Sequence, residues 1–309
     1  MIKKDWLLRL ASVARFIVLI IIEPFYYYYL QLASKLGIVN LSKIYYGNKK
    51  RKPVKNSIVR VCVHEWGGYS LEREKNFSET SSNECGLKFQ LQRFLSYREN
   101  GFVNLTVTMS DSNKHNELEY VKQNCDNFLE VSNVGMDFSG YSTFFHSIEN
   151  NDNCYVILTN SSVEKSQTDF LEGYIKYMVE NPDVGMLGIS YSTRMYHTLI
   201  RRNFIPHIQS FFVMTTLDVL KEIVRANKGK FPGENADYKR LLIRKGEIPL
   251  SRLALKLGYR LAVVYPEDGV PFKFTDKKHW THPFDDLRLI CSKPSYISEI
   301  KSQSYPYIV

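Results

Sequence analysis

The chain lacks the motifs by which the common α/β enzymes are identified. No G-x-x-x-x-G-K-[ST] loop and no G-x-G-x-x-G follows any strand-like run, which argues against a P-loop nucleotide hydrolase and a dinucleotide oxidoreductase. There is no G-x-S-x-G elbow, as an α/β-hydrolase would have, and no H-E-x-x-H zinc motif. Internal repeats are also absent, and the only low-complexity tract is the tyrosine run 26–29. Function must therefore be inferred from composition and from the order of less specific motifs.

Cysteine is scarce as well. The five cysteines form no C-x-x-C pair, and their number is odd; they are Cys62, Cys85, Cys125, Cys154 and Cys291. Cys62 and Cys154 lie within apolar runs. This pattern is typical of free thiols in a reducing compartment, rather than of a disulfide framework or a zinc site.

Positive charge is confined to one end of the chain. The net charge is +9, but residues 1–60 hold 12 Lys/Arg and 2 Asp/Glu, whereas residues 61–309 hold 29 and 30. A nucleic-acid-binding enzyme would more often carry its basic patch on the folded domain, so we expect no nucleic-acid partner. A basic, apolar N-terminus beside a neutral domain favours contact with an anionic membrane surface.

The N-terminal segment is apolar but interrupted. Residues 6–30 contain Arg9, Arg15 and Glu23, and the uninterrupted apolar run, 16–22, has seven residues. A spanning helix needs about 20 largely apolar residues, whereas the tyrosines at 26–29 suit a membrane–water interface. We expect an interfacial or shallowly inserted helix; a spanning helix, or one packed on the protein or a partner, remains an alternative.

These features predict three segments. Residues 1–48 form a membrane-associated segment, 49–56 a basic linker, and 57–309 the globular domain. The basic cluster at 49–55 would favour anionic headgroups, so residues 1–55 as a whole are expected to contact the membrane. The corresponding location is the cytoplasmic face of the cell membrane, with peripheral or single-anchor attachment.

The globular part alternates strand-like and helix-like runs. Strands are expected at 57–66, 102–110, 127–135, 154–163 and 184–191, and helices at 86–100, 115–125, 141–151 and 167–182. This rhythm predicts an α/β domain of Rossmann-like type, with a mostly parallel central sheet covered by helices on both faces.

Ligands of such sheets bind beyond the carboxyl ends of the strands. That rule selects the segments 64–68, 110–112, 133–140 and 160–162 as the rim of a site. The residues within them that we expect to bind a donor substrate are His64, Trp66, Asp111, Asn133, Gly135, Asp137, Asn160, Ser161 and Ser162. Trp66 suits stacking on a base, or a role in the core or a lid.

The stretch SNVGMDFSGY, 132–141, is the first polar constellation. Gly135 and Gly140 permit tight turns or close backbone approach to a ligand, and Asp137 between them can accept hydrogen bonds from sugar or ribose hydroxyls. The alternative is a loop with a helix N-cap at Ser139 or Ser142.

Two further constellations lie towards the C-terminus. The apolar strand SFFVMTT follows His207 and Gln209 and begins with Ser210. These three polar residues would line a pocket, or merely solvate the strand edge. Glu247 lies at an expected helix start, where the helix dipole would keep it ionised as a general base. The alternative is that Glu247 only offsets the positive end of the helix dipole and has no catalytic role.

The order of these motifs resembles that of GT-A type glycosyltransferases. GEIPLSRLALKLGYRLAVVYP, with Glu247 and Arg252, is similar to the Glu-Asp-x-Glu-Leu-x-x-Arg motif, helix, Gly-Tyr and strand that carry the acceptor base in large inverting families, although the doubled acid is absent. SNVGMDFSGY, ILTNSSV and HIQSFF resemble three runs of bacterial polysaccharide transferases of the rhamnan-synthesis type. The resemblance covers about residues 57–270.

The resemblance implies an inverting glycosyltransferase that uses a nucleotide-sugar donor. The acceptor would be a growing surface polysaccharide, such as an O-antigen or capsule, or a lipid-linked glycan. Glu247 would be the base, and His207, Gln209, Ser210 and Arg252 would serve the acceptor pocket.

The metal-binding Asp-x-Asp of many such enzymes is replaced here by Asn160-Ser161-Ser162. Because magnesium and manganese prefer carboxylate oxygens, the metal requirement stays open. Basic side chains would otherwise neutralise the donor diphosphate, and Arg194, Arg201 and Arg202 are candidates.

Two other functions remain alternatives. One is a membrane-attached, non-catalytic protein of degenerate transferase fold that binds glycans or nucleotide sugars, for which the missing Asp-x-Asp is the main argument. The other is a nucleotidyltransferase, although HEWGGYSLER lacks the Gly-rich basic signature expected after the first strand.

Overall fold

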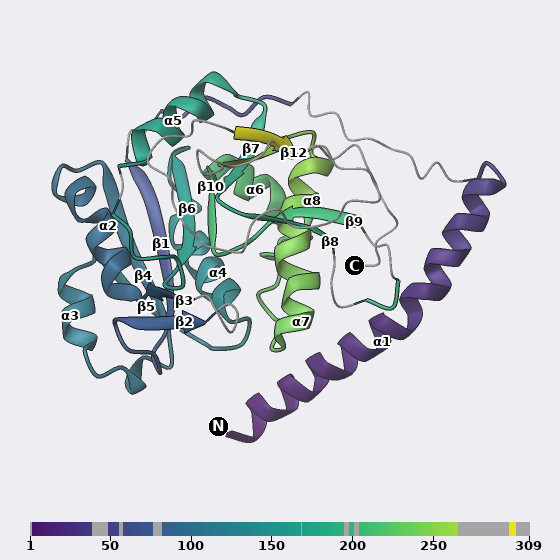
Figure 1. Cartoon of the computed structure of the whole chain (residues 1–309), viewed down its shortest axis with the longest axis horizontal. Coiled ribbons are helices and arrows are strands. Elements are labelled where there is room, and N and C mark those ends of the chain that lie inside the picture. Colours follow the sequence, from purple (N-terminus) through teal and green to yellow (C-terminus); the bar gives the residue numbers. More distant parts are fainter. Residues whose placement is uncertain are drawn as a thin grey trace.

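The computed structural model describes residues 2–38, 49–55, 58–76, 82–167, 169–194, 198–200, 204–264 and 297–300. At its centre is an eight-stranded sheet of order β12-β11-β7-β10-β6-β1-β4-β5 (Figure 1). Its strands are β1 (Val59–Trp66), β4 (Val103–Ser110), β5 (Asn127–Val131), β6 (Tyr155–Asn160), β7 (Val184–Gly188), β10 (Phe212–Thr216), β11 (Arg260–Val264) and β12 (Ile297–Ile300).

The sheet is mainly parallel, as the sequence predicts. Strand β1 lies between β4 and β6 and pairs in parallel with both, so that Val61 faces Leu105 on one side and Ile157 on the other. Strands β5, β7 and β11 run the same way, whereas β10 and β12 are antiparallel to their neighbours. Because β10 runs in the opposite direction, its first residues lie at the edge where the parallel strands end.

Helices cover both faces of the sheet, as predicted. Helices α2 (Leu87–Glu99), α3 (Leu118–Gln123) and α5 (Leu171–Glu180) contribute to one apolar core, and α4 (Asp137–Ile148), α6 (Leu217–Ala226) and α8 (Ile248–Lys256) to the other. Val61 and Val63 of β1 belong to the first core and Cys62 to the second. Burial on both faces explains why the strands read as continuous apolar runs.

The cysteines of the described residues are free thiols, as expected. Cys62, Cys85, Cys125 and Cys154 are all buried and form no disulfide. The fifth, Cys291, lies outside the described residues.

Two small hairpins were not predicted. Strand β2 (Arg73–Asn76) pairs with β3 (Ser82–Cys85), and β8 (Tyr191–Arg194) pairs with β9 (Phe204–Ile208), both antiparallel. The sequences of β2 and β3, REKN and SNEC, have no apolar alternation to reveal them.

Helix α1 (Ile2–Lys35) runs along one side of the domain (Figure 1). One stripe of it is buried there and comprises Ser12, Phe16, Glu23, Leu30 and Ala33. None of the described helices is long and apolar enough to cross a membrane.

The basic stretch 49–55 lies against the domain. Lys49 Nζ is 2.5 Å from Glu222 Oε2, and the buried Arg51 guanidinium donates to the carbonyl oxygens of Val184 and Met178. The segment is therefore anchored where the sequence suggested a linker.

The helix predicted to begin at Glu247 begins earlier. Residues 239–256 form one helical run made of α7 (Lys239–Leu242), a π-helical turn (Ile243–Glu247) and α8. Glu247 thus lies in the middle of a helix, and the prediction that a free helix N-terminus keeps it ionised is wrong. A π-helical turn within an α-helix is frequent at functional sites.

Candidate functional site

Polar residues from four segments meet at the carboxyl edge of the parallel strands. His64 and Trp66 end β1, Asp111 follows β4, Asp137 begins α4, and Asn160 ends β6. His64 is paired in register with Asn160, and Trp66 with Ser110, so these ends lie at the same level of the sheet. The structure brings the expected donor-binding residues together, and their roles in binding stay predictions.

Asp137 and Asn160 form the centre of this cluster. Asn160 Nδ2 donates to Asp137 Oδ2 over 2.7 Å, and His64 Nε2 lies 4.0 Å from Asp137 Oδ1. The other side of the Asn160 amide, Oδ1, accepts hydrogen bonds from Ser162 N at 3.0 Å and Ser162 Oγ at 2.5 Å. About a third of the Asp137 side chain, 34%, remains exposed, so this carboxylate can still reach a ligand.

His64 is buried beneath the cluster. Its Nδ1 lies 3.1 Å from Thr108 Oγ1. Burial lowers the pKa of His64, and the nearby Asp137 carboxylate opposes that shift without cancelling it. The imidazole is therefore neutral at pH 7 and positions its neighbours without adding charge.

The two glycines near Asp137 serve the packing of the chain. A Cβ on Gly140 would stand 2.3 Å from His64 Nδ1 and 2.4 Å from Thr108 Oγ1, so only glycine lets α4 approach the sheet this closely. Gly135 has a φ of +97°, and a Cβ there would meet the Glu234 carbonyl oxygen at 2.4 Å. These contacts account for both glycines in the fold, and the expected part of Gly135 in donor binding stays a prediction. The alternative of an N-cap at Ser139 or Ser142 is wrong, because α4 begins at Asp137 and both serines lie inside it. Ser139 Oγ donates to the Ser132 and Met136 carbonyls.

Two residues beside the cluster have strained backbone. Met136, just before Asp137, has φ 48° and ψ −129°, and Asp111 has φ 52° and ψ 41°. Positive φ values are uncommon outside glycine and persist only where the surroundings enforce them. Strain of this kind clusters at functional sites, which marks this edge of the sheet.

Glu247 belongs to a second cluster. Its Oε2 accepts hydrogen bonds from both the N–H and the hydroxyl of Ser210, each at 2.8 Å, and its Oε1 lies 3.4 Å from His207 Nε2. Burial pushes the pKa of Glu247 upwards, but the hydrogen bonds and charge attraction from His207 and Ser210 outweigh it, so the net shift is downwards. Glu247 is therefore a carboxylate that stays ionised although only 14% of its side chain is exposed.

The two clusters are neighbours. Ser210 lies at the carboxyl edge because Phe212 is paired with Thr159 and Asn160 N donates to the Phe211 carbonyl over 3.2 Å. Helix α4 contributes a second link, since the Tyr141 hydroxyl donates to the Ser210 carbonyl over 3.0 Å. One edge of the sheet thus carries both the Asp137–Asn160 pair and the Glu247–Ser210 pair.

The other expected acceptor residues are placed less directly. The Gln209 N–H donates to the Ser190 carbonyl over 3.0 Å, and the two side chains also contact each other, so Gln209 is held by Ser190. Arg252 is half-buried on α8. Of the cations expected at the diphosphate, Arg201 and Arg202 lie outside the described residues, and Arg194 lies in β8.

Arg73 was missed by the sequence reasoning. From β2, its NH1 donates to Glu65 Oε2 over 2.9 Å, its NH2 donates to Ser161 Oγ over 2.6 Å, and its guanidinium lies 4.1 Å from the Tyr69 ring centre. Burial raises the pKa of Glu65, and the Arg73 charge opposes the shift. A carboxylate within the apolar run of β1 is the signal that could have indicated a buried partner.

Trp66 is fixed at the same edge. Its Nε1 donates to Asp111 Oδ2 over 2.9 Å, and Lys114 Nζ donates to the same oxygen over 2.8 Å. The hydrogen bonds from Lys114 and Trp66 lower the pKa of Asp111. The Tyr69 ring packs edge-on against Trp66, with 4.8 Å between the centroids.

The described residues hold no group of three or more His, Cys, Asp or Glu side chains that could bind a metal. At the position of the expected acid pair, Asn160 directs its NH2 group towards Asp137. A cation would have to displace this donor, so the edge as it stands favours hydrogen-bonding groups over a metal.

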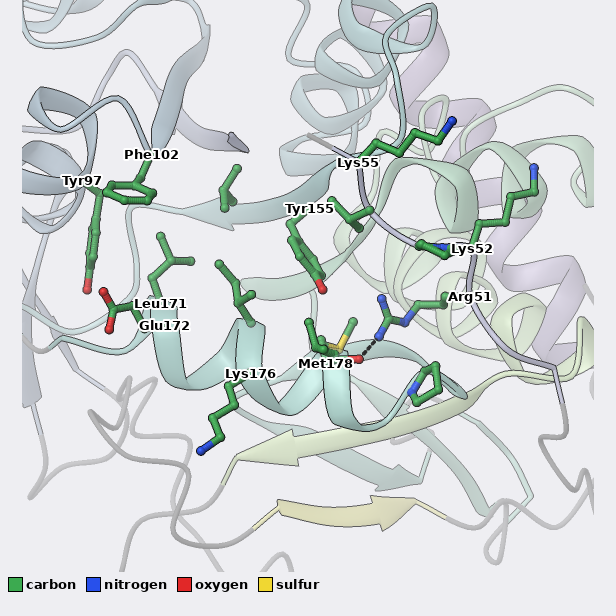
Figure 2. Close-up of a pocket in the computed structure, with 16 residues that line it drawn as sticks. Arg51, Lys52, Lys55, Tyr97, Phe102, Tyr155, Leu171, Glu172, Lys176 and Met178 are labelled. Atoms are coloured by element: carbon green, nitrogen blue, oxygen red, sulfur yellow. Dashed lines mark hydrogen bonds between the residues drawn. The ribbon is translucent and has the colours of Figure 1, made fainter. Parts of the chain in front are cut away.

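A cavity of about 720 Å³ lies at the opposite end of the strands. Figure 2 shows it between α5 and the segment 51–55, with Tyr97 and Phe102 on one side and Arg51, Lys52 and Lys55 on the other. Val59 and Tyr155, the first residues of β1 and β6, line it. It is therefore separate from the polar carboxyl edge.

Known proteins similar to this chain give no information on its function. No family model matches the chain, and no curated protein does. One similar solved structure is that of CMP:2-keto-3-deoxy-manno-octonic acid synthetase complexed with CTP, with a TM-score of 0.36 and 11% identity over 68% of this chain and 90% of that chain. A likeness at this level carries no argument about activity.

Proposed function

We propose that this chain is a glycosyltransferase that moves a sugar from a nucleotide-sugar donor to a glycan or lipid-linked acceptor, with inversion at the anomeric carbon. The observation that carries the proposal is the Glu247 carboxylate, which Ser210 and His207 keep ionised beside the carboxyl edge of the sheet. Ligands of such sheets bind at that edge, and an ionised carboxylate there can serve as a general base.

The two oxygens of Glu247 have different tasks in this mechanism. Oε2 accepts two hydrogen bonds from Ser210, each at 2.8 Å, whereas Oε1 has the longer contact with His207 Nε2, at 3.4 Å, so Oε1 is the oxygen that takes the proton of the acceptor hydroxyl. The acceptor oxygen forms a bond to the anomeric carbon while the bond from that carbon to the diphosphate oxygen breaks. The nucleoside diphosphate leaves with the electron pair, and the attack from the opposite face inverts the configuration.

The donor side of the proposal uses neutral hydrogen-bond donors and one cation. The hydroxyls of Ser161 and Ser162 lie at the edge beside Arg73, whose guanidinium already contacts Ser161 Oγ. Guanidinium groups recognise phosphate oxygens through paired hydrogen bonds. Asp137, partly exposed, would hold a sugar or ribose hydroxyl, and Trp66 would stack on the base.

The acceptor class is proposed from the motif order along the chain. A growing surface polysaccharide or a lipid-linked glycan fits the resemblance of residues 132–141, 157–163 and 207–212 to bacterial polysaccharide transferases.

The test is a turnover assay on the full chain and on Glu247→Gln. UDP-, dTDP- and GDP-sugars are screened with glycan acceptors, with and without Mn²⁺, and released nucleoside diphosphate is measured. We expect Glu247→Gln to lower kcat at least about a hundredfold, as loss of a general base does, with little change in donor affinity. Glu222→Gln, which removes a carboxylate bound to Lys49 and Tyr259 away from the edge, is the matched control.

Three outcomes would contradict the proposal. Full activity of a correctly folded Glu247→Gln would remove the base assignment. Release of pyrophosphate from a nucleoside triphosphate and a sugar phosphate would make the chain a nucleotidyltransferase. Binding of a nucleotide sugar without turnover on any acceptor would make it a non-catalytic binding protein.

A further inference from the structure

Helix α1 has two apolar faces, and the domain covers one of them. Its buried stripe, which includes Ser12, Phe16, Glu23 and Leu30, faces the protein. At about 100° per residue, the exposed apolar residues are centred about 180° away, on the opposite side of the helix. The exposed large apolar side chains of α1 and the turn after it are Trp6, Leu7, Leu8, Leu10, Ile17, Val18, Ile21, Ile22, Phe25, Tyr26, Tyr28, Tyr29, Leu32, Leu36 and Ile38.

This exposed face, hereafter the outer stripe, extends from Trp6 to the C-terminal end of the helix. Ile21 is 54% exposed and Phe25 73%, near the middle of α1. Helix α1 ends at Lys35, so the stripe is about 45 Å long within the helix. Continuous apolar surface of this extent is rare on soluble monomers and marks an interaction site.

The charges around the outer stripe indicate its partner. From Trp6 onward, the only carboxylate among the described side chains of α1 is Glu23, which is buried against Arg244. Arg9, Arg15 and Lys35 are all exposed. On the helical projection Arg15 and Lys35 flank the stripe, where long cationic side chains can reach lipid headgroups while their stems lie on apolar surface. An anionic lipid surface complements this arrangement of charge.

We propose that α1 lies in the plane of an anionic bilayer, with the outer stripe in the interfacial region and the opposite face on the domain. The buried stripe stays packed on the protein, so lipid cannot surround the helix as it surrounds a spanning one. Arg9 and Arg15 would also be costly within the hydrocarbon core. This inference is independent of the proposed reaction, because it rests on α1 alone.

The contacts of the buried stripe fix the helix to the segment that carries Glu247. Phe16 packs against Tyr238 with 5.3 Å between ring centroids, and Ser12 Oγ accepts from Asp237 N over 3.2 Å. Glu23 pairs with Arg244 in the π-helical turn that ends at Glu247. The bilayer would therefore hold the domain in one orientation relative to its surface.

The first experiment measures flotation of the full chain with vesicles. We expect binding to vesicles of phosphatidylcholine with 30% phosphatidylglycerol, and at least about tenfold weaker binding to phosphatidylcholine alone, because the flanking cations need anionic headgroups. A chain that floats with neither vesicle would overturn the proposal.

The second experiment changes the outer stripe. We expect Ile21→Glu and Phe25→Glu each to reduce the vesicle-bound fraction at least about tenfold at half-saturating lipid, since each places a charge in the interfacial region. Leu95→Glu makes the same kind of change at an exposed residue of α2, on the other side of the domain from α1 (Figure 1), and should bind as the unchanged chain does.

The same variants show what the outer stripe contacts if the proposal is wrong. If the chain forms a dimer in solution that Ile21→Glu dissociates, and neither protein binds vesicles, the stripe is an interface between two copies. If the stripe variants bind vesicles as tightly as Leu95→Glu, α1 is not the membrane contact. Neither result depends on turnover, so failure here is distinguishable from failure of the transferase proposal.

Discussion

Asn160 donates a hydrogen bond to Asp137 over 2.7 Å, so a carboxamide stands beside a partly exposed carboxylate of the edge. The amide oxygen is held by Ser162, which fixes the NH2 group towards Asp137. Two carboxylates at this separation would repel each other unless a proton or a cation lay between them. A carboxamide beside a single carboxylate avoids this repulsion and adds a hydrogen bond, which explains how the edge can lack a metal-binding acid pair.

Asn160→Asp tests this relationship. We expect the substitution to cost about 1–3 kcal/mol, because Asp137 loses a hydrogen bond and gains a like charge. Millimolar Mn²⁺ should recover part of the loss, since the paired carboxylates form a site that a divalent cation prefers. Thermal unfolding with and without Mn²⁺ measures both effects, and Asn133→Asp, at an exposed residue, is the control. Equal melting temperatures for the unchanged chain and Asn160→Asp without metal would contradict the argument.

The buried His64 gives a pH dependence of stability. Burial lowers the pKa of His64 in the folded protein, whereas the unfolded chain has a pKa near 6.5. As the pH falls below about 6.5, the unfolded state takes up a proton that the folded state does not. The free energy of unfolding then decreases by up to about 1.4 kcal/mol per pH unit from this residue.

We expect His64→Asn to flatten this part of the profile. The measurement is urea denaturation between pH 5 and 7 for the unchanged chain, His64→Asn and His146→Asn. His146 is exposed and serves as the control. If the two variants have the same slope with pH, His64 is not the residue responsible.

The substitution Gly140→Ala tests how closely α4 packs on the sheet. The sign of the change in the free energy of unfolding gives the answer. An ordinary Gly→Ala change within a helix stabilises a protein by about 0.5–1 kcal/mol. At this position the new Cβ would stand 2.3 Å from His64 Nδ1 and 2.4 Å from Thr108 Oγ1, so we expect a destabilisation of about 1–3 kcal/mol. Denaturant unfolding measures it, with the exposed Ser147→Ala in the same helix as control. A stabilised Gly140→Ala would show that α4 can move away from the sheet without cost.

The strands of the central sheet could be predicted from the sequence where their apolar runs are long. Strands such as β1 and β6 are buried on both faces, so they appear as continuous apolar segments. The hairpin β2–β3 could not be found this way, because its residues are mostly polar and its pairing depends on contacts across the chain. The antiparallel direction of β10 was also hidden, since periodicity carries no information on strand direction.

The sequence selected residues that cluster at the carboxyl edge, but it did not indicate the contacts between them. The rule that ligands bind beyond strand ends selected His64, Asp137 and Asn160, and the register places their strand ends together. Arg73 was missed because it lies in a polar hairpin, although it contacts Ser161. For Glu247, the sequence suggested the helix dipole, whereas the structure shows that Ser210 and His207, some 40 residues earlier, keep it ionised.

Substitutions of the buried ion pair between Glu23 and Arg244 test how α1 is attached to the domain. The two side chains are 2% and 1% exposed, the distance from Glu23 Oε1 to Arg244 NH2 is 2.7 Å, and Glu23 Oε2 accepts from Thr198 Oγ1 over 2.6 Å. Removing one partner of a buried pair leaves an uncompensated charge and typically costs about 3–5 kcal/mol. We therefore expect Glu23→Gln to lower the free energy of unfolding by that amount.

The double variant separates the pair from its parts. Arg244→Met alone would leave the Glu23 carboxylate buried, whereas Glu23→Gln with Arg244→Met removes both charges and keeps most of the volume. Because the double variant leaves no uncompensated buried charge, it should be more stable than either single one. Urea denaturation of all four proteins gives the coupling free energy. If the losses of the two single variants simply add, Glu23 and Arg244 do not hold α1 to the π-helical turn, and the attachment rests on Phe16 and its apolar neighbours instead.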